Sequence, residues 1–209
     1  MVHEMLGLRQ IPESKWKDFS ARVKAAKGQA ILLVHPFYHD IGTDSTYQRT
    51  VTKLLKQDKL PVVILQGRSK WATNQGKYPD HALVIPTYPE SSPVLLEKLE
   101  KSADEKYDEL HKELAEKLSN AGVKTVHLGG MYSDAGRISG RENDELSQLI
   151  AESEKKLGHS TEKFQIRFGC LGITYANLIK TGKIPKIQLI APALYPRRPE
   201  YYRSTKQFP

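Results

Sequence analysis

Short, largely apolar runs recur along this chain, and each ends at or within two residues of a glycine or a proline. They are AILLV at 30–34, PVVILQ at 61–66, ALVIP at 82–86, KTVHLGG at 124–130, FQIRF at 164–168 and KIQLIAP at 186–192. A strand that is apolar on successive residues is buried on both faces, which is typical of a parallel sheet covered by helices. The runs therefore predict a mostly parallel sheet of about five or six strands.

The segments between these runs have the three- and four-residue apolar spacing of amphipathic helices. We expect helices at 12–27, about 45–57, 93–120, about 144–157 and 170–181. Strands that alternate with helices predict a three-layer α/β/α fold, Rossmann-like or flavodoxin-like, whose strand order the sequence leaves open. Residues 1–194 are expected to form one domain, and residues 195–209 a basic arm rich in proline and tyrosine.

Length and composition favour an ordinary globular protein. The chain has 209 residues, 39% of them hydrophobic, and none of its apolar runs is long enough to cross a bilayer. The N-terminus lacks the pattern of an export signal, and one cysteine allows no intrachain disulfide. We therefore expect a cytoplasmic protein with no membrane partner.

The net charge of +8 is concentrated toward the C-terminus. Residues 161–209 hold nine basic and two acidic side chains, which favours an anionic partner through long-range attraction. Within the arm, Arg197, Arg198 and Arg203 alternate with Tyr201 and Tyr202, a pattern compatible with phosphate contacts and base stacking. Packing of the arm on its own protein or on a second subunit explains the same pattern and is favoured here over nucleic-acid binding.

In a sheet of this kind, ligands bind beyond the carboxyl ends of the strands. The residues that follow the predicted strands are therefore the candidate site, and many of them are polar, charged or glycine. They are His35, His39 and Asp40; Arg68; Gly129, Gly130, Tyr132, Asp134, Arg137 and Arg141; and Gly169, Cys170, Gly172 and Thr174.

Cys170 is the sharpest candidate, because it stands at the predicted start of a helix. Backbone N–H groups and the positive end of the helix dipole lower the pKa of a thiol placed there. A nucleophilic Cys170 with His35 or His39 as its base is then chemically reasonable, and Asp134 could also act in proton transfer. A small buried cysteine that packs behind the turn is the alternative.

A cysteine at a helix start after a late strand resembles the layout of the isochorismatase-like cysteine hydrolases. The resemblance implies an α/β fold with a nucleophilic cysteine at this position. The chain departs from that pattern at the end of its first strand, where the family has an aspartate and this sequence has His35 and Pro36. It also has no lysine that can be matched to that of the family.

The turns GGMYSDAG and FGCLG allow backbone amides to approach an anion closely, although neither matches a standard phosphate-binding motif. Arg68, Arg137 and Arg141 suit a phosphate or a carboxylate through forked hydrogen bonds. Close packing of the glycines and solvation of the arginines are the alternatives.

His35, His39 and Asp40 include metal-ligand atoms but match no standard zinc spacing. We expect His127 to be packed and hydrogen-bonded within a strand, and His111 to lie on the surface.

These features predict a small enzyme that binds an anionic small molecule, a nucleotide or a sugar phosphate, and acts as a hydrolase or a group transferase. The residues do not identify a cofactor. The alternative is a non-catalytic module that binds nucleic acid or a protein through its basic C-terminal region. The long helix at 93–120 could instead serve a homo-oligomer.

Overall fold

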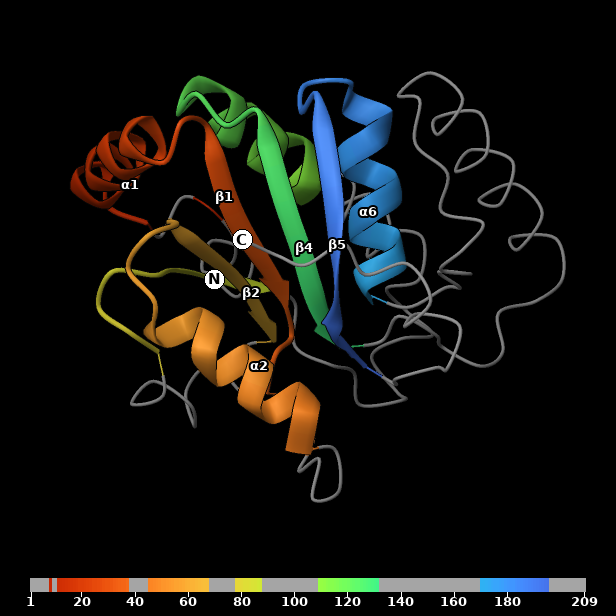
Figure 1. Cartoon of the computed structure of the whole chain (residues 1–209). Coiled ribbons are helices and arrows are strands. Elements are labelled where there is room, and N and C mark those ends of the chain that lie inside the picture. The colour runs from red at the N-terminus through yellow and green to blue at the C-terminus, as the bar shows by residue number, and fades with distance from the viewer. Residues whose placement is uncertain are drawn as a thin grey trace, which may run out of the picture.

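The computed structural model describes residues 8, 11–37, 45–67, 78–87, 109–131 and 170–195. Within these residues the fold is a five-stranded parallel sheet with helices on both faces (Figure 1). The strands are β1 (Gln29–Val34), β2 (Val62–Gly67), β3 (Leu83–Thr87), β4 (Thr125–Met131) and β5 (Lys186–Tyr195). The three-layer α/β prediction is confirmed.

The strand order is β3-β2-β1-β4-β5. β2 and β3 therefore lie on one side of the β1–β4 pair, and β5 lies on the other. This is the order of a Rossmann-like sheet, not of a flavodoxin-like one. In register, Leu32 of β1 lies beside Leu128 of β4 on one side and Val63 of β2 on the other. β1 is therefore the central strand, paired along most of its length on both edges.

Four helical segments cover the sheet in the described part of the chain. They are α1 (Glu13–Ala25), α2 (Ser45–Lys56), residues 109–120 and α6 (Cys170–Thr181). The expected inner faces are buried: Trp16, Phe19 and Val23 in α1, and Tyr47, Val51, Leu54 and Leu55 in α2. Of the helix expected at 93–120, the structure describes the helical part 109–120, in which Leu110, Leu114 and Leu118 are buried.

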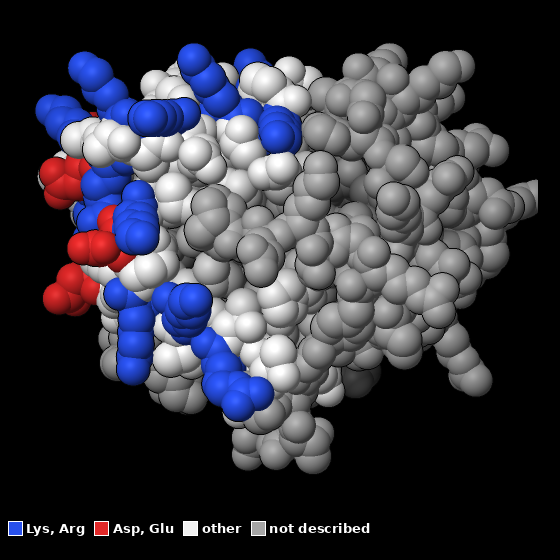
Figure 2. Space-filling model, viewed as in Figure 1, with Lys and Arg blue, Asp and Glu red and all other residues white. Residues whose placement is uncertain are grey.

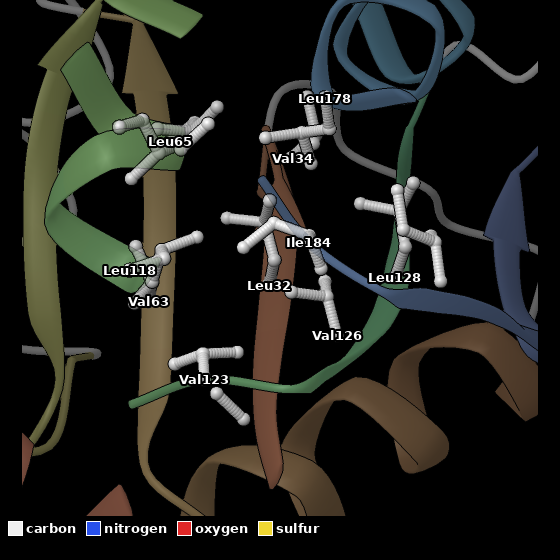
Figure 3. Close-up of a cluster of buried hydrophobic side chains, with 14 of the residues drawn as sticks. Leu32, Val34, Val63, Leu65, Leu118, Val123, Val126, Leu128, Leu178 and Ile184 are labelled. Atoms are coloured by element: carbon white, nitrogen blue, oxygen red, sulfur yellow. The ribbon is translucent and has the colours of Figure 1, made fainter. Parts of the chain in front are cut away.

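Strand alternation divides the core into two clusters, one on each face. Leu32, Val34, Val63 and Leu65 point toward α1, the 109–120 helix and α6. Figure 3 shows Leu178 of α6 beside Val34, and Leu118 and Val123 on the same side of the sheet. Ile31, Leu33, Val62 and Ile64 belong to the opposite cluster, which α2 covers with Tyr47, Val51 and Leu54. Because both faces are covered, the strands are apolar at nearly every position.

Two predictions concern β5 and the strand before it. The strand expected at 164–168 lies outside the described residues, as does the helix expected at 144–157. The strand expected to end at Pro192 continues to Tyr195. A register shift against β4 separates the pair Leu128–Leu189 from the pair Gly130–Leu194, so β5 bulges and Pro192 lies within the bulge. A bulge tolerates proline because it interrupts the hydrogen-bonded ladder, and the strand then resumes.

The glycine pair of β4 allows its backbone to lie close to both neighbouring strands. Gly130 lies beside Val34 of β1 with φ at +137°, and a Cβ there would collide with the Val34 carbonyl oxygen and amide nitrogen. A Cβ at Gly129 would come within 3.0 Å of Ala193 Cβ in the bulge. The pair thus lets β4 lie tightly between β1 and the bulge of β5.

No helix among the described residues is both long and apolar enough to cross a membrane.

Replacing Gly130 with alanine is expected to destabilise the protein by more than about 3 kcal/mol, because the new Cβ has no room against the Val34 backbone. Gly182 is the matched control, since its φ is also positive, at 64°, but nothing lies within 4 Å of an added Cβ. Gly182→Ala should cost only about 1–2 kcal/mol, from the left-handed backbone alone. Urea unfolding of both variants measures the difference in stability. Equal losses of stability would show that contact with the Val34 backbone is not what requires glycine at position 130.

Candidate functional site

The strand order reverses between β1 and β4, which makes the carboxyl edge of this pair the expected ligand crevice. Three features meet at this edge. His35 follows β1, the glycine pair and Met131 end β4, and α6 begins at Cys170. Because each connecting helix runs back toward the next strand, α2 and α6 both direct their N-termini to this edge. Helix N-termini favour anions there.

His35 has an unusual backbone. Its φ is +47°, in the left-handed region that residues other than glycine seldom adopt, and its side chain is only 2% exposed. Its N–H donates to the Leu65 carbonyl at 2.7 Å, so the β1–β2 ladder extends to this residue before Pro36 ends it. A strained residue at a strand end is a recurrent feature of functional sites.

The left-handed turn directs the imidazole across the sheet. His35 Nε2 lies 3.0 Å from Thr87 Oγ1, at the end of β3, although β2 separates β1 from β3. Gly67 ends β2 beside Thr87 in register and carries no side chain, which leaves room for the ring to reach Thr87. Alternation places Thr87 on the same face as Ile85, the face covered by the 109–120 helix and α6.

A second buried histidine lies on that face. His111 is 2% exposed, and its Nε2 lies 3.0 Å from Thr174 Oγ1 of α6. The Asn177 amide nitrogen lies 3.2 Å from His111 Nδ1 and can only donate, so Nδ1 accepts and Nε2 carries the proton toward Thr174. These contacts join the 109–120 helix to the first turns of α6 through polar groups.

Burial is the main cause, and the nearby His111 the second, of a pKa of His35 that is lowered from its usual 6.5 to about 4. His35 is therefore neutral at pH 7. A neutral imidazole can accept a proton or share a hydrogen bond, but it does not supply the positive charge that would lower the pKa of a neighbouring thiol. Any role for His35 at this edge is therefore that of a neutral partner.

The opposite side of the edge is aromatic. Tyr47 of α2 donates from its hydroxyl to the Pro36 carbonyl at 3.2 Å, and its ring lies 5.7 Å from that of Tyr195, at the end of β5. Phe37 and Tyr78 form a second pair at 6.0 Å. Histidines thus lie on the α6 side of the strand ends, and aromatic rings on the α2 side.

The structure brings six of the predicted site residues to this edge. His35, Gly129 and Gly130 lie at the ends of β1 and β4, and Cys170, Gly172 and Thr174 occupy the first two turns of α6. Gly172 and Thr174 are buried. The remaining predicted residues lie outside the described part of the chain: His39, Asp40, Arg68, Tyr132, Asp134, Arg137, Arg141 and Gly169.

Two predictions about other histidines are tested. His127 is buried in β4, and its Nε2 lies 2.9 Å from Gln29 Oε1, so the prediction of a packed, hydrogen-bonded residue is confirmed. The prediction that His111 lies on the surface is wrong. It falls within the buried stripe of its helix with Leu110, Leu114 and Leu118, and that spacing could have revealed it.

Basic side chains lie along the outer face of α2. Figure 2 shows blue lysines and arginines at the lower left, where Figure 1 places α2. α2 contains no acidic residue, and Arg49, Lys53 and Lys56 are exposed along a shallow depression on its outer face. Lys53 and Lys56 lie in the last turn of α2, so this charge extends away from the strand ends.

Within the described ranges, no three histidine, cysteine, aspartate or glutamate side chains gather as a metal site would require. His39 and Asp40 lie outside these ranges. Comparison of the chain with protein-family models, with curated proteins and with solved structures gives no match.

The lowered pKa of His35 predicts acid sensitivity. The unfolded chain binds this proton near pH 6.5 and the folded protein only near pH 4, so acidification between these values favours unfolding. The loss should reach roughly 3 kcal/mol by pH 4. His35→Asn should remove this part of the slope, because asparagine tolerates the left-handed backbone and does not titrate. Urea unfolding of both proteins from pH 7 to pH 4 tests this prediction. Parallel plots of stability against pH for the wild-type protein and His35→Asn would contradict it.

The contact between His111 and Thr174 should also be measurable. In a double-mutant cycle of His111→Leu and Thr174→Val, we expect a coupling energy of about 1–2 kcal/mol, because each single change leaves a buried polar partner behind. A cycle that pairs His111→Leu with Thr181→Val is the control, since Thr181 bonds the Leu178 carbonyl and not His111. Coupling of the same size in the control would mean that the first cycle does not report a direct contact.

Proposed function

We propose that this protein binds an anionic small molecule, a nucleotide or a sugar phosphate, at the carboxyl edge of β1 and β4. The observation that carries the proposal is His35, a non-glycine residue held at a left-handed φ and buried where the strand order reverses. Backbone strain is retained where the surrounding structure enforces it, most often at functional sites.

The anion would be held by groups that the fold already directs to this edge. The N-termini of α2 and α6 offer backbone N–H groups and the positive ends of their dipoles. The glycine pair of β4 keeps the strand end free of side chains beside Val34. Arg68, Arg137 and Arg141 are proposed to complete the binding of the charge.

We further propose a hydrolase or group-transfer reaction, with Cys170 as the nucleophile at the start of α6. His39 or His35 would accept the thiol proton, and Asp134 would assist proton transfer. Because the pKa of His35 is lowered to about 4, His35 is a weak base at pH 7, so its contribution would be that of a positioning partner and His39 would be the better proton acceptor. The low pKa of the thiol would then come from the helix N-terminus and from neighbouring arginines.

Alkylation of Cys170 tests the proposal, because the chain has a single cysteine and any label reports on that position. We expect a thiol pKa at least one unit below the ordinary value of ~8.5, and slower alkylation with one member of a panel of nucleotides and sugar phosphates. The rate of iodoacetamide labelling between pH 5 and pH 9 provides both measurements.

Cys170→Ser separates binding from chemistry. Calorimetry with the protective ligand should give unchanged affinity in this variant if Cys170 reacts but does not bind. A thiol of ordinary pKa that no ligand protects would contradict the nucleophile, and the absence of binding by every member of the panel would contradict the anion site.

A further inference from the structure

The end of β2 carries a buried carboxamide without a partner. Gln66 is 0% exposed, and neither its Oε1 nor its Nε2 has a hydrogen-bond partner within the structure as described. Leaving a buried polar group unpaired lowers the stability of the fold, so such groups are rare in folded proteins. Gln57, at the end of α2, shows the usual arrangement: its amide donates to the Leu60 carbonyl at 2.9 Å and accepts from the Leu60 N–H at 2.8 Å.

The neighbourhood of Gln66 offers few backbone donors. In register, Gln66 lies beside Pro86 of β3, and on the other side β1 ends at His35 and Pro36. Neither proline has an N–H, and the His35 N–H is already bonded to the Leu65 carbonyl. Tyr47 donates its hydroxyl to the Pro36 carbonyl. The amide thus lies at the carboxyl edge with its hydrogen-bonding capacity unused.

Aromatic rings lie on the same face of the sheet. Alternation places Gln66 with Val62 and Ile64, whose cluster also includes the half-buried rings of Phe37 and Tyr78. Phe37 follows Pro36 directly after β1, and its ring lies 6.0 Å from that of Tyr78. Aromatic side chains of this kind provide flat surfaces on which a base can stack.

We infer that Gln66 recognises the base of a nucleotide whose phosphate is held at the β1–β4 edge, which rests on the function proposed above. A carboxamide presents one donor and one acceptor side by side, and adenine presents the complementary pair through its amino group and a ring nitrogen. A sugar phosphate has no such planar edge. The inference narrows the ligand class to nucleotides and commits to adenine, whose amino group and ring nitrogen can satisfy both atoms of the amide.

Gln66→Met tests this inference, because methionine keeps the length of the side chain and removes its hydrogen bonds. We expect the variant to be more stable than the wild-type protein, with the midpoint of urea unfolding raised by about 0.5 M. Gln57→Met is the matched control, and its midpoint should fall, since both of its bonds to Leu60 are lost. Gln66→Leu is a second variant in case methionine packs poorly.

Calorimetry with AMP, adenosine and ribose 5-phosphate separates base recognition from phosphate binding. In Gln66→Met we expect AMP and adenosine to bind at least tenfold more weakly and ribose 5-phosphate to bind as it does to the wild-type protein.

The other outcomes distinguish base recognition by Gln66 from the proposed anion site. If Gln66→Met is destabilised as Gln57→Met is, the amide has a partner such as an ordered water, and the inference is overturned. If AMP and ribose 5-phosphate bind the wild-type protein equally and Gln66→Met changes neither, base recognition fails while the anion site stands. If adenosine alone binds and depends on Gln66, base recognition stands and the anion site fails. Absence of binding by all three compounds overturns both.

Discussion

The contact between the backbones of β1 and β4 sets the geometry of everything around it. Gly130 lies so close to Val34 that no side chain fits between them, and β1 is paired on its other edge with β2. A strand held on both edges cannot shift to relieve its neighbours. His35 follows this strand directly and adopts a left-handed backbone. The strained residue of the candidate site therefore lies next to the tight central pair.

The two faces of the sheet accommodate polar groups at the carboxyl edge in different ways. On the side of α6, the histidines are paired: His35 with Thr87, and His111 with Thr174 and Asn177. On the side of α2, Gln66 is buried without a partner beside two prolines. Buried polar groups that are paired stabilise a fold or lower its stability little. An unpaired one lowers the stability, so its retention needs another reason. The proposal that Gln66 contacts a ligand rests on this contrast.

Sequence patterns were sufficient for the fold because the strands are buried on both faces. Continuous apolar runs such as 30–34 and 61–66 cannot belong to a half-exposed sheet, and the helices between them carry clear apolar stripes. The end of β5 was harder to predict, because a proline such as Pro192 normally ends a strand. Only the bulge opposite Gly129 allows this strand to continue. A bulge depends on the partner strand, which a local pattern does not include.

The site was predictable only as a set of strand ends. The topology brings His35, the glycine pair and the start of α6 to one edge, as expected for any parallel sheet. The pairings were not predictable, because Thr87 lies 52 residues from His35 and Thr174 lies 63 residues from His111. Gln66 had no signal of its own, since a glutamine at the end of an apolar run reads as a strand terminus. Its burial depends on α2 and on the neighbouring strands. A polar residue that tertiary packing encloses without a partner is visible only once the fold is known, and for that reason the proposed role of Gln66 could not be predicted from the sequence.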